Sequence, residues 1–291
     1  MQIRTDLALE KNELINHSDN GIETATTRTA DMKITRMKIN DTSVINREKG
    51  TYITCEFKAL TDNFTAADTR ISEIGEQIRS LIPKEGTVLV VGVGNHNITP
   101  DAIGPKTASK ILATRHIQGD IAKSLGFEGL RSVCTFSPGV LGQTGIELGE
   151  MICGIKTNTD ISCIIAVDAL ASRRLYRLGC TVQISDTGIA PGSGVGNNRL
   201  ALNKDTMGVP VIGIGVPTVV DAATLAADLI SPDNEEESDK LREIVYYNSR
   251  GMVVTPRDID LLVERASTLI GMSINAALHP DISAEDIFAL I

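Results

Sequence analysis

The chain has 291 residues, enough for one large domain or two small ones, with 28 Lys and Arg against 37 Asp and Glu. The resulting net charge of -9 disfavours a general electrostatic grip on nucleic acid or anionic lipid. With four Tyr, five Phe and no Trp, the chain has few aromatic side chains on which nucleic-acid bases could stack. The same low aromatic count means that the core must be aliphatic.

The cysteines and the N-terminus indicate an intracellular protein. The five cysteines form no CxxC pair, and their odd number argues against a disulfide framework. Residues 1–10 lack an apolar stretch, so no secretory signal is expected. Gly, Pro or charged residues break each apolar run before the roughly 20 residues that a bilayer requires, so no membrane association is expected.

Residue periodicity predicts strands that alternate with helices along the chain. Residues 1–46 are polar and rich in Thr, apart from one alternating stretch. The elements expected in the first 110 residues are an edge strand at 32–39, a strand at 51–57, a helix at 67–82, a buried strand at 87–93 and a helix beginning near Asp101.

The second half continues this alternation. The expected elements are helices at 142–154 and 170–178, a buried strand at 163–167 closed by Asp168, a short strand at 180–184, a strand at 209–216 closed by Pro217, a helix at 219–229, a solvated loop at 231–239 and a helix at 256–277. This order predicts an α/β fold, a three-layer sandwich around a mostly parallel sheet. Ligands of such sheets collect at the carboxyl ends of the strands, so the loops after Val93, Val167 and Ile184 are the candidate site.

The Gly92-Val93-Gly94-Asn95 turn follows a strand as a nucleotide-binding loop would. The third glycine of a dinucleotide fingerprint is missing, so a tight strand exit is the favoured interpretation and a nucleotide-dependent oxidoreductase the weaker one.

Two acidic residues follow apolar strands, and each has two interpretations. Asp101 would serve as a helix N-cap or as a catalytic acid. Asp168 ends an apolar run, where desolvation and a second acid would raise one pKa, or where it would pair with Arg173 or Arg174.

A third acid lies in Asp186-Thr187-Gly188, the triplet of pepsin-like proteases, but those are all-β proteins and this pattern is α/β. The glycine-rich segment 190–199 that follows is either a surface loop or a place where backbone approaches an extended substrate.

Other chemistries have less support. The four histidines show no HExxH or paired spacing, so no metal site and no cofactor are expected. Ser137 lacks a G-x-S-x-G elbow, and Cys134 lies in an apolar context typical of a buried thiol.

Four motifs together resemble the germination protease family of spore-forming bacteria over essentially the whole chain. They are Arg4-Thr5-Asp6-Leu7-Ala8-Leu9-Glu10, Gly92 to Asn95 with Thr99 to Pro105, Val167-Asp168-Ala169-Leu170-Ala171-Ser172-Arg173, and Ile184 to Gly188 with Pro191 to Asn197.

The resemblance implies an atypical aspartic endopeptidase that cuts small acid-soluble spore proteins in the spore core, folded like hydrogenase maturation peptidases and assembled as a homotetramer. By motif, the catalytic acids are Asp101 and Asp168. The resemblance does not implicate Asp186, which would be structural or would support a substrate loop together with Gly94, Asn95, Gly192 and Gly194. Backbone N–H groups of residues 92–95 would stabilise an oxyanion.

The hydrogenase maturation peptidases use two acids and a histidine to bind nickel of their substrate. This sequence has no histidine between His116 and His279, which favours a metal-free pair of acids that share one proton. A metal-dependent peptidase with oxygen ligands is the alternative.

The N-terminus imitates the cleavage segment of the family's substrates. Self-processing between Asp6 and Leu7 would therefore make residues 1–6 a propeptide and residues 7–291 a single catalytic domain. The non-enzymatic alternative is a module that binds spore proteins without cutting them.

Overall fold

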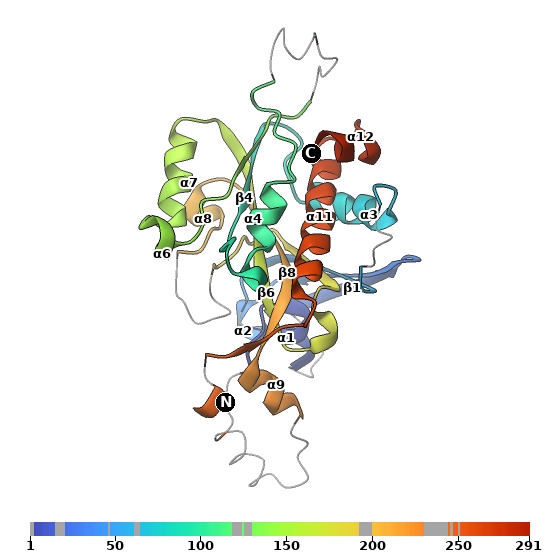
Figure 1. The fold of residues 1–291 in the computed structure, drawn as a ribbon, viewed down its shortest axis with the longest axis vertical. Coiled ribbons are helices and arrows are strands. Elements are labelled where there is room, and N and C mark those ends of the chain that lie inside the picture. Colours follow the sequence, from blue (N-terminus) through green and yellow to red (C-terminus); the bar gives the residue numbers. More distant parts are fainter. Residues whose placement is uncertain are drawn as a thin grey trace.

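The computed structural model describes residues 3–14, 21–45, 47–60, 65–117, 130–191, 200–229 and 251–291, together with residues 124, 244 and 247–249. One sheet forms the centre of the molecule, with helices on both sides (Figure 1). The α/β class and the three layers are therefore confirmed. No helix within the described ranges is both long and apolar enough to cross a membrane.

The sheet combines a parallel half with an antiparallel half. In spatial order the strands are β1 (Ile22–Arg28), β2 (Met32–Ile39), β3 (Gly50–Phe57), β7 (Thr181–Ser185), β8 (Val211–Asp221), β6 (Ile161–Ser172), β4 (Thr87–Gly92) and β5 (Val133–Phe136). Neighbours from β8 to β5 are parallel, and neighbours from β1 to β8 are antiparallel. The short β9 (Val253–Val254) pairs with the end of β8.

One face of the sheet is covered by α3 (Thr69–Arg79), α4 (Ile103–Ala108) and the long α11 (Ile259–Leu278) (Figure 1). The opposite face is covered by α6 (Leu141–Thr144), α7 (Leu148–Thr157) and α8 (Lys204–Met207) over the parallel half, and by α1 (Ala8–Leu14) with α2 (Thr42–Ile45) over β2 and β3. Of the remaining helices, α12 (Ala284–Leu290) adds its buried Ile287 to the core of α3 and α11, and α9 (Ala222–Leu229) follows the end of β8.

Alternation along β6 decides which layer receives its acid. Ile165 and Val167 belong to the core beneath α11, whereas Ile164 and Ala166 pack toward α7. Successive side chains of a strand point to opposite faces, so Asp168 shares the face of Ile164 and Ala166. The acid therefore faces the layer built from α7 and the N-terminal segment.

Several expected elements are confirmed. The strand at 51–57 is β3, the helix at 67–82 is α3, the strand at 180–184 is β7 and the helix at 256–277 is α11. The stripe on α3 faces the core, because Ile71, Ile74 and Ile78 are buried there. The expected helix at 142–154 is divided into α6 and α7 at Gly145, whose φ is +70°.

Other expectations were wrong. The strand at 32–39 is not at the edge, because β1 pairs outside it. Neither Asp168 nor Pro217 ends its strand: β6 continues to Ser172 and β8 to Asp221, since each supplies the pairing partner of the other. The helix expected at 170–178 is reduced to the 3-10 turn η2 (Leu175–Arg177) for the same reason. The loop at 231–239 lies outside the described residues.

Candidate active site

Asp101 is held by the loop that leaves β4. It ends the 3-10 turn η1 (Thr99–Asp101), and the backbone N–H of Asn95 donates to its Oδ2 at 2.7 Å. Gly94 has a φ of +121°, and a Cβ there would lie 2.1 Å from the carbonyl oxygen of Asp101. Only glycine fits this turn. The N-cap of α4 is Ala102, so the capping interpretation of Asp101 was wrong.

Two further contacts fix η1 against the sheet. The hydroxyl of Thr218 on β8 donates to the carbonyl oxygen of Pro100 at 2.7 Å. On α4, a Cβ at Gly104 would lie 2.2 Å from the oxygen of Val93 and 2.4 Å from that of Val167. Helix α4 therefore rests directly on the backbone just after β4 and on β6 at the residue before Asp168.

Asp168 lies within β6, opposite Gly215 of β8. The residue is only 8% exposed, and the N–H of Ala169 donates to its Oδ1 at 2.9 Å. Arg173 and Arg174, considered as its partners, both pair with Asp228 instead, at 2.5 and 3.0 Å.

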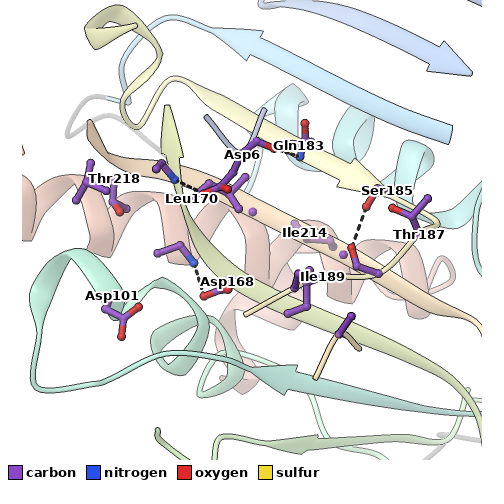
Figure 2. A pocket seen from close by; sticks show the side chains of 18 of the residues that line it. Asp6, Asp101, Asp168, Leu170, Gln183, Ser185, Thr187, Ile189, Ile214 and Thr218 are labelled. Atoms are coloured by element: carbon purple, nitrogen blue, oxygen red, sulfur yellow. Dashed lines mark hydrogen bonds between the residues drawn. The ribbon is translucent and has the colours of Figure 1, made fainter. Parts of the chain in front are cut away.

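Both acids line two neighbouring cavities. The larger has a volume of about 480 Å³ and extends over Gly213 and Gly215 of β8. The smaller, of about 120 Å³, is bordered by Gly94 and Glu147. Figure 2 shows Asp101 and Asp168 reaching the larger cavity from η1 and β6. Acids at the boundary of two cavities suit a chain that extends past them in both directions.

The N-terminal segment forms another wall of the larger cavity. The N–H of Asp6 donates to the oxygen of Ala171, and the N–H of Ala171 donates to Oδ2 of Asp6, both at 2.8 Å. The carbonyl oxygen of Asp6 accepts from Arg47 Nη2 at 2.5 Å and from Gln183 Nε2 at 3.1 Å (Figure 2). Burial raises the pKa of Asp6. Leu7 follows, fully buried.

Beyond Leu7, a buried ionic cluster anchors α1. Glu10 is completely buried, and one carboxylate oxygen accepts from Arg177 Nη1 at 3.0 Å. Arg177 also contacts Glu13 at 2.6 Å and Glu56 at 3.2 Å. Burial lowers the pKa of Arg177, but the hydrogen bonds with Glu13 and Glu10 more than offset this effect and raise it. The cluster ties the N-terminal segment to η2 and β3.

The other site residues predicted from the sequence make structural contacts or lie outside the described residues. Asn95 orients Asp101, and its Oδ1 accepts from Gln143 Nε2 at 2.9 Å. Two of the N–H groups expected to stabilise an oxyanion have other acceptors. The N–H of Asn95 donates to Asp101, and the N–H of Val93 donates to the carbonyl oxygen of Val167. Asp186 accepts from the N–H of Thr51 at 2.7 Å, a structural contact. Gly192, Gly194 and most of the segment 190–199 lie outside the described residues.

Sequence reasoning missed the residues that hold the Asp6 carbonyl and the η1 turn, namely Arg47, Gln183 and Thr218. The position of Gln183 could have been predicted, because successive side chains of a strand point to opposite faces of the sheet. Gln183 lies between the apolar Val182 and Ile184 and therefore faces the side of the sheet opposite to theirs. Among the described residues, no group of three or more His, Cys, Asp or Glu side chains is arranged to hold a metal ion.

The family model and the curated relatives that match this chain agree with each other. Residues 3–233 match the peptidase A25 family model, described as germination protease. A germination protease from Clostridium acetobutylicum is 40% identical, with 98% of each chain covered. One from Bacillus cereus is 33% identical, covering 98% of this chain and 95% of its own. The crystal structure of the [NiFe] hydrogenase maturation protease HycI from Thermococcus kodakarensis matches at 16% identity with a TM-score of 0.35, covering 68% of this chain and 98% of that one.

Proposed function

The chain belongs to the germination protease family, and we propose that it is the endopeptidase that begins the breakdown of small acid-soluble proteins during spore germination. The observation that carries the mechanism is the position of Asp101 and Asp168, which come from the η1 turn after β4 and from within β6 and line the same two cavities. An endopeptidase must hold substrate on either side of the cut bond, and two cavities that share the acids suit that requirement.

In this mechanism the two carboxyl groups share one proton, because neighbouring carboxylates do not ionise independently. The ionised acid takes a proton from water, whose oxygen bonds to the scissile carbonyl carbon. The protonated acid donates to the nitrogen of the leaving amine as the C–N bond breaks. The N–H groups of Asn95 and Ala169 each hold one oxygen of their acid and so orient the pair.

The chain is also proposed to be a zymogen in which residues 1–6 are a propeptide. Asp6 lines the larger cavity, and the segment docked there would restrict the access of a substrate. Its carbonyl is held by Gln183 on β7, and β8 lies between β7 and the strand of Asp168. Asp6 is also hydrogen-bonded to Ala171, three residues beyond Asp168 on β6, so at about 3.3 Å per residue the bond would need to move roughly 10 Å to reach Asp168. In this conformation the bond between Asp6 and Leu7 is therefore too far from the acids to be cut.

The decisive experiment incubates the full chain with a small acid-soluble spore protein and identifies the products by mass spectrometry. We expect cleavage after an acidic residue of the substrate and, in the chain itself, between Asp6 and Leu7. Asp101→Asn and Asp168→Asn should abolish both reactions and keep the fold. Asp186→Asn is the matched control, since this acid lies in a structural contact, and it should retain activity. Full activity of either catalytic variant would rule out the acid pair.

Two finer expectations are tested alongside. Activity that persists in chelator, in protein free of bound metal, supports the metal-free acids, whereas loss of activity supports the metal-dependent alternative. Binding of the spore protein without any product would instead support a non-catalytic module. Assembly as a homotetramer, measured by light scattering, and a location in the spore core, observed by microscopy, complete the proposal.

A further inference from the structure

The hydroxyl of Thr5 connects the cleavage site to the buried carboxylate of Glu10. Thr5 Oγ1 accepts from the N–H of Leu7 at 3.1 Å and donates to Glu10 Oε2. The same Glu10 carboxylate accepts from the N–H groups of Arg173 at 2.6 Å and Arg174 at 3.0 Å. The nitrogen of the proposed cleavage bond is thus one hydroxyl group away from a fully buried anion.

Cleavage between Asp6 and Leu7 would change both ends of this contact. Water adds its oxygen to the carbonyl carbon of Asp6, the C–N bond breaks, and the Leu7 nitrogen becomes an α-ammonium group after taking up protons. Thr5 departs with the propeptide, so Glu10 Oε2 loses a donor. A buried carboxylate that loses a hydrogen bond is destabilised unless another donor replaces it.

The charges around Glu10 favour a cation as that replacement. The carboxylates of Glu10, Glu13 and Glu56 surround Arg177, and Lys33 contacts Glu56 at 2.9 Å. In this described cluster three anions therefore share two cations. A new positive charge beside Glu10 would balance the third anion in a place that water does not reach.

Two cations near Asp6 oppose this arrangement. Arg47 donates to the carbonyl oxygens of Thr5 and Asp6, at 3.3 and 2.5 Å. Lys11 lies nearby, and burial together with Arg47 lowers its pKa to about 8. Both cations interact electrostatically with Asp6, which leaves with the propeptide. Glu10, in contrast, is hydrogen-bonded to the Thr5 hydroxyl, which accepts from the Leu7 nitrogen and would be replaced by the ammonium group.

We propose that Glu10 is the binding site for the α-ammonium group of Leu7 that cleavage creates. This inference rests on the proposed processing after Asp6. The new ion pair replaces the Thr5 bridge and keeps the mature N-terminus in place. The N–H of Ala8, which donates to Gln183 Oε1 at 2.6 Å, then still holds the Gln183 side chain in the cavity wall. Gln183 Nε2 loses its acceptor, the carbonyl oxygen of Asp6, when the propeptide leaves. Processing thus removes Asp6 from the cavity and leaves Gln183 in place in its wall.

The test measures the ionisation of the Leu7 amine. The full chain is folded, cleaved between Asp6 and Leu7, and treated with an acylating reagent that reacts with neutral amines, and labelling of Leu7 is followed by mass spectrometry from pH 6 to 10. A free α-amine has a pKa of about 7.7–8.0, and pairing with Glu10 should move the midpoint of labelling up by about one pH unit. At pH 7 this lowers the labelling rate about tenfold.

Three variants decide between an ion pair and simple burial. Glu10→Gln should return the midpoint to about 8. Glu13→Gln, the matched control, removes a carboxylate that also binds Arg177 and should leave the shifted midpoint unchanged. If Glu10→Gln does not fold, a cleaved chain with one additional Gly before Leu7 displaces the ammonium group and should label as a free amine. An unshifted midpoint in the unaltered cleaved chain overturns the proposal.

The source of the cleaved chain separates this proposal from the function. Failure of the chain to cleave itself counts against the proposed zymogen. A recognition sequence for a site-specific endopeptidase in place of residues 1–6 then still produces the Leu7 terminus, and the labelling midpoint of that chain tests the ion pair alone.

Discussion

Replacing Gly104 by alanine should affect the site through one methyl group. Its Cβ would meet the oxygens of Val93 and Val167 at 2.2 and 2.4 Å, whereas real Cβ atoms stay at least 3.0 Å from such neighbours. Helix α4 must therefore move away from the sheet by at least 0.8 Å, the difference between 3.0 and 2.2 Å. Because Asp101 lies three residues before Gly104, on the turn that leads into α4, the two acids lose their alignment.

The expected size follows from this displacement. Overpacking of a rigid backbone contact costs about 1–3 kcal/mol, and we expect about 3 kcal/mol because all the clashing atoms are backbone. A misplacement of about 1 Å at a catalytic group costs on the order of a hundredfold in rate. Thermal unfolding and the rate of spore-protein cleavage measure the two effects.

Gly154→Ala is the matched control. Gly154 lies in helix α7, and a Cβ there has no atom within 4 Å. The same substitution should stabilise the protein by about 0.5–1 kcal/mol, because alanine favours the helix, and leave activity unchanged. A Gly104→Ala protein with an unaltered Tm and full activity would refute the packing argument.

Three further outcomes are expected. Thr218→Val removes the hydrogen bond to Pro100 and should cost about 1–2 kcal/mol with a reduced kcat, measured by unfolding in urea and by steady-state kinetics; an unchanged kcat would mean that η1 does not depend on this bond. Burial lowers the pKa of His279, so below pH about 6.5 the unfolded state binds more protons and the free energy of unfolding falls. His279→Leu should remove that part of the pH dependence between pH 5 and 7.5, and an identical pH profile would contradict it. Arg177→Met leaves three carboxylates without their shared cation and should cost about 3–5 kcal/mol, against less than about 1 for the half-exposed Lys33→Met; equal losses would refute the role of burial.

Most of the core elements were predictable because their signals are local, whereas the two candidate acids were assigned from motifs that resemble the family. Apolar runs before Gly92 and Asp168 indicated buried strands, and the stripe on α3 indicated a helix. Parallel strands bring their carboxyl ends to one edge, so two acids at such ends were expected to meet. The match of residues 3–233 to the germination protease model agrees with the motifs that suggested this family.

The ends of β6 and β8 show where local signals mislead. An acid and a proline normally end a strand, and both interrupt these apolar runs. The two strands nevertheless pair beyond them, with Leu170 opposite Pro217 and a register irregularity that begins at the next pair. The partner across the sheet decided the length, and that partner lies more than 40 residues away in the sequence.

The sequence by itself therefore determined the class of fold and the family, because hydrophobic periodicity and short motifs depend on neighbouring residues, and the family motifs named the two candidate acids. Only the tertiary structure decided where the N-terminal segment lies. Its polar character indicated no element, yet Asp6 binds at Ala171 and Glu10 binds at Arg177, contacts that span about 165 residues. Such pairings depend on how the sheet and η2 are arranged in space, which no local pattern records.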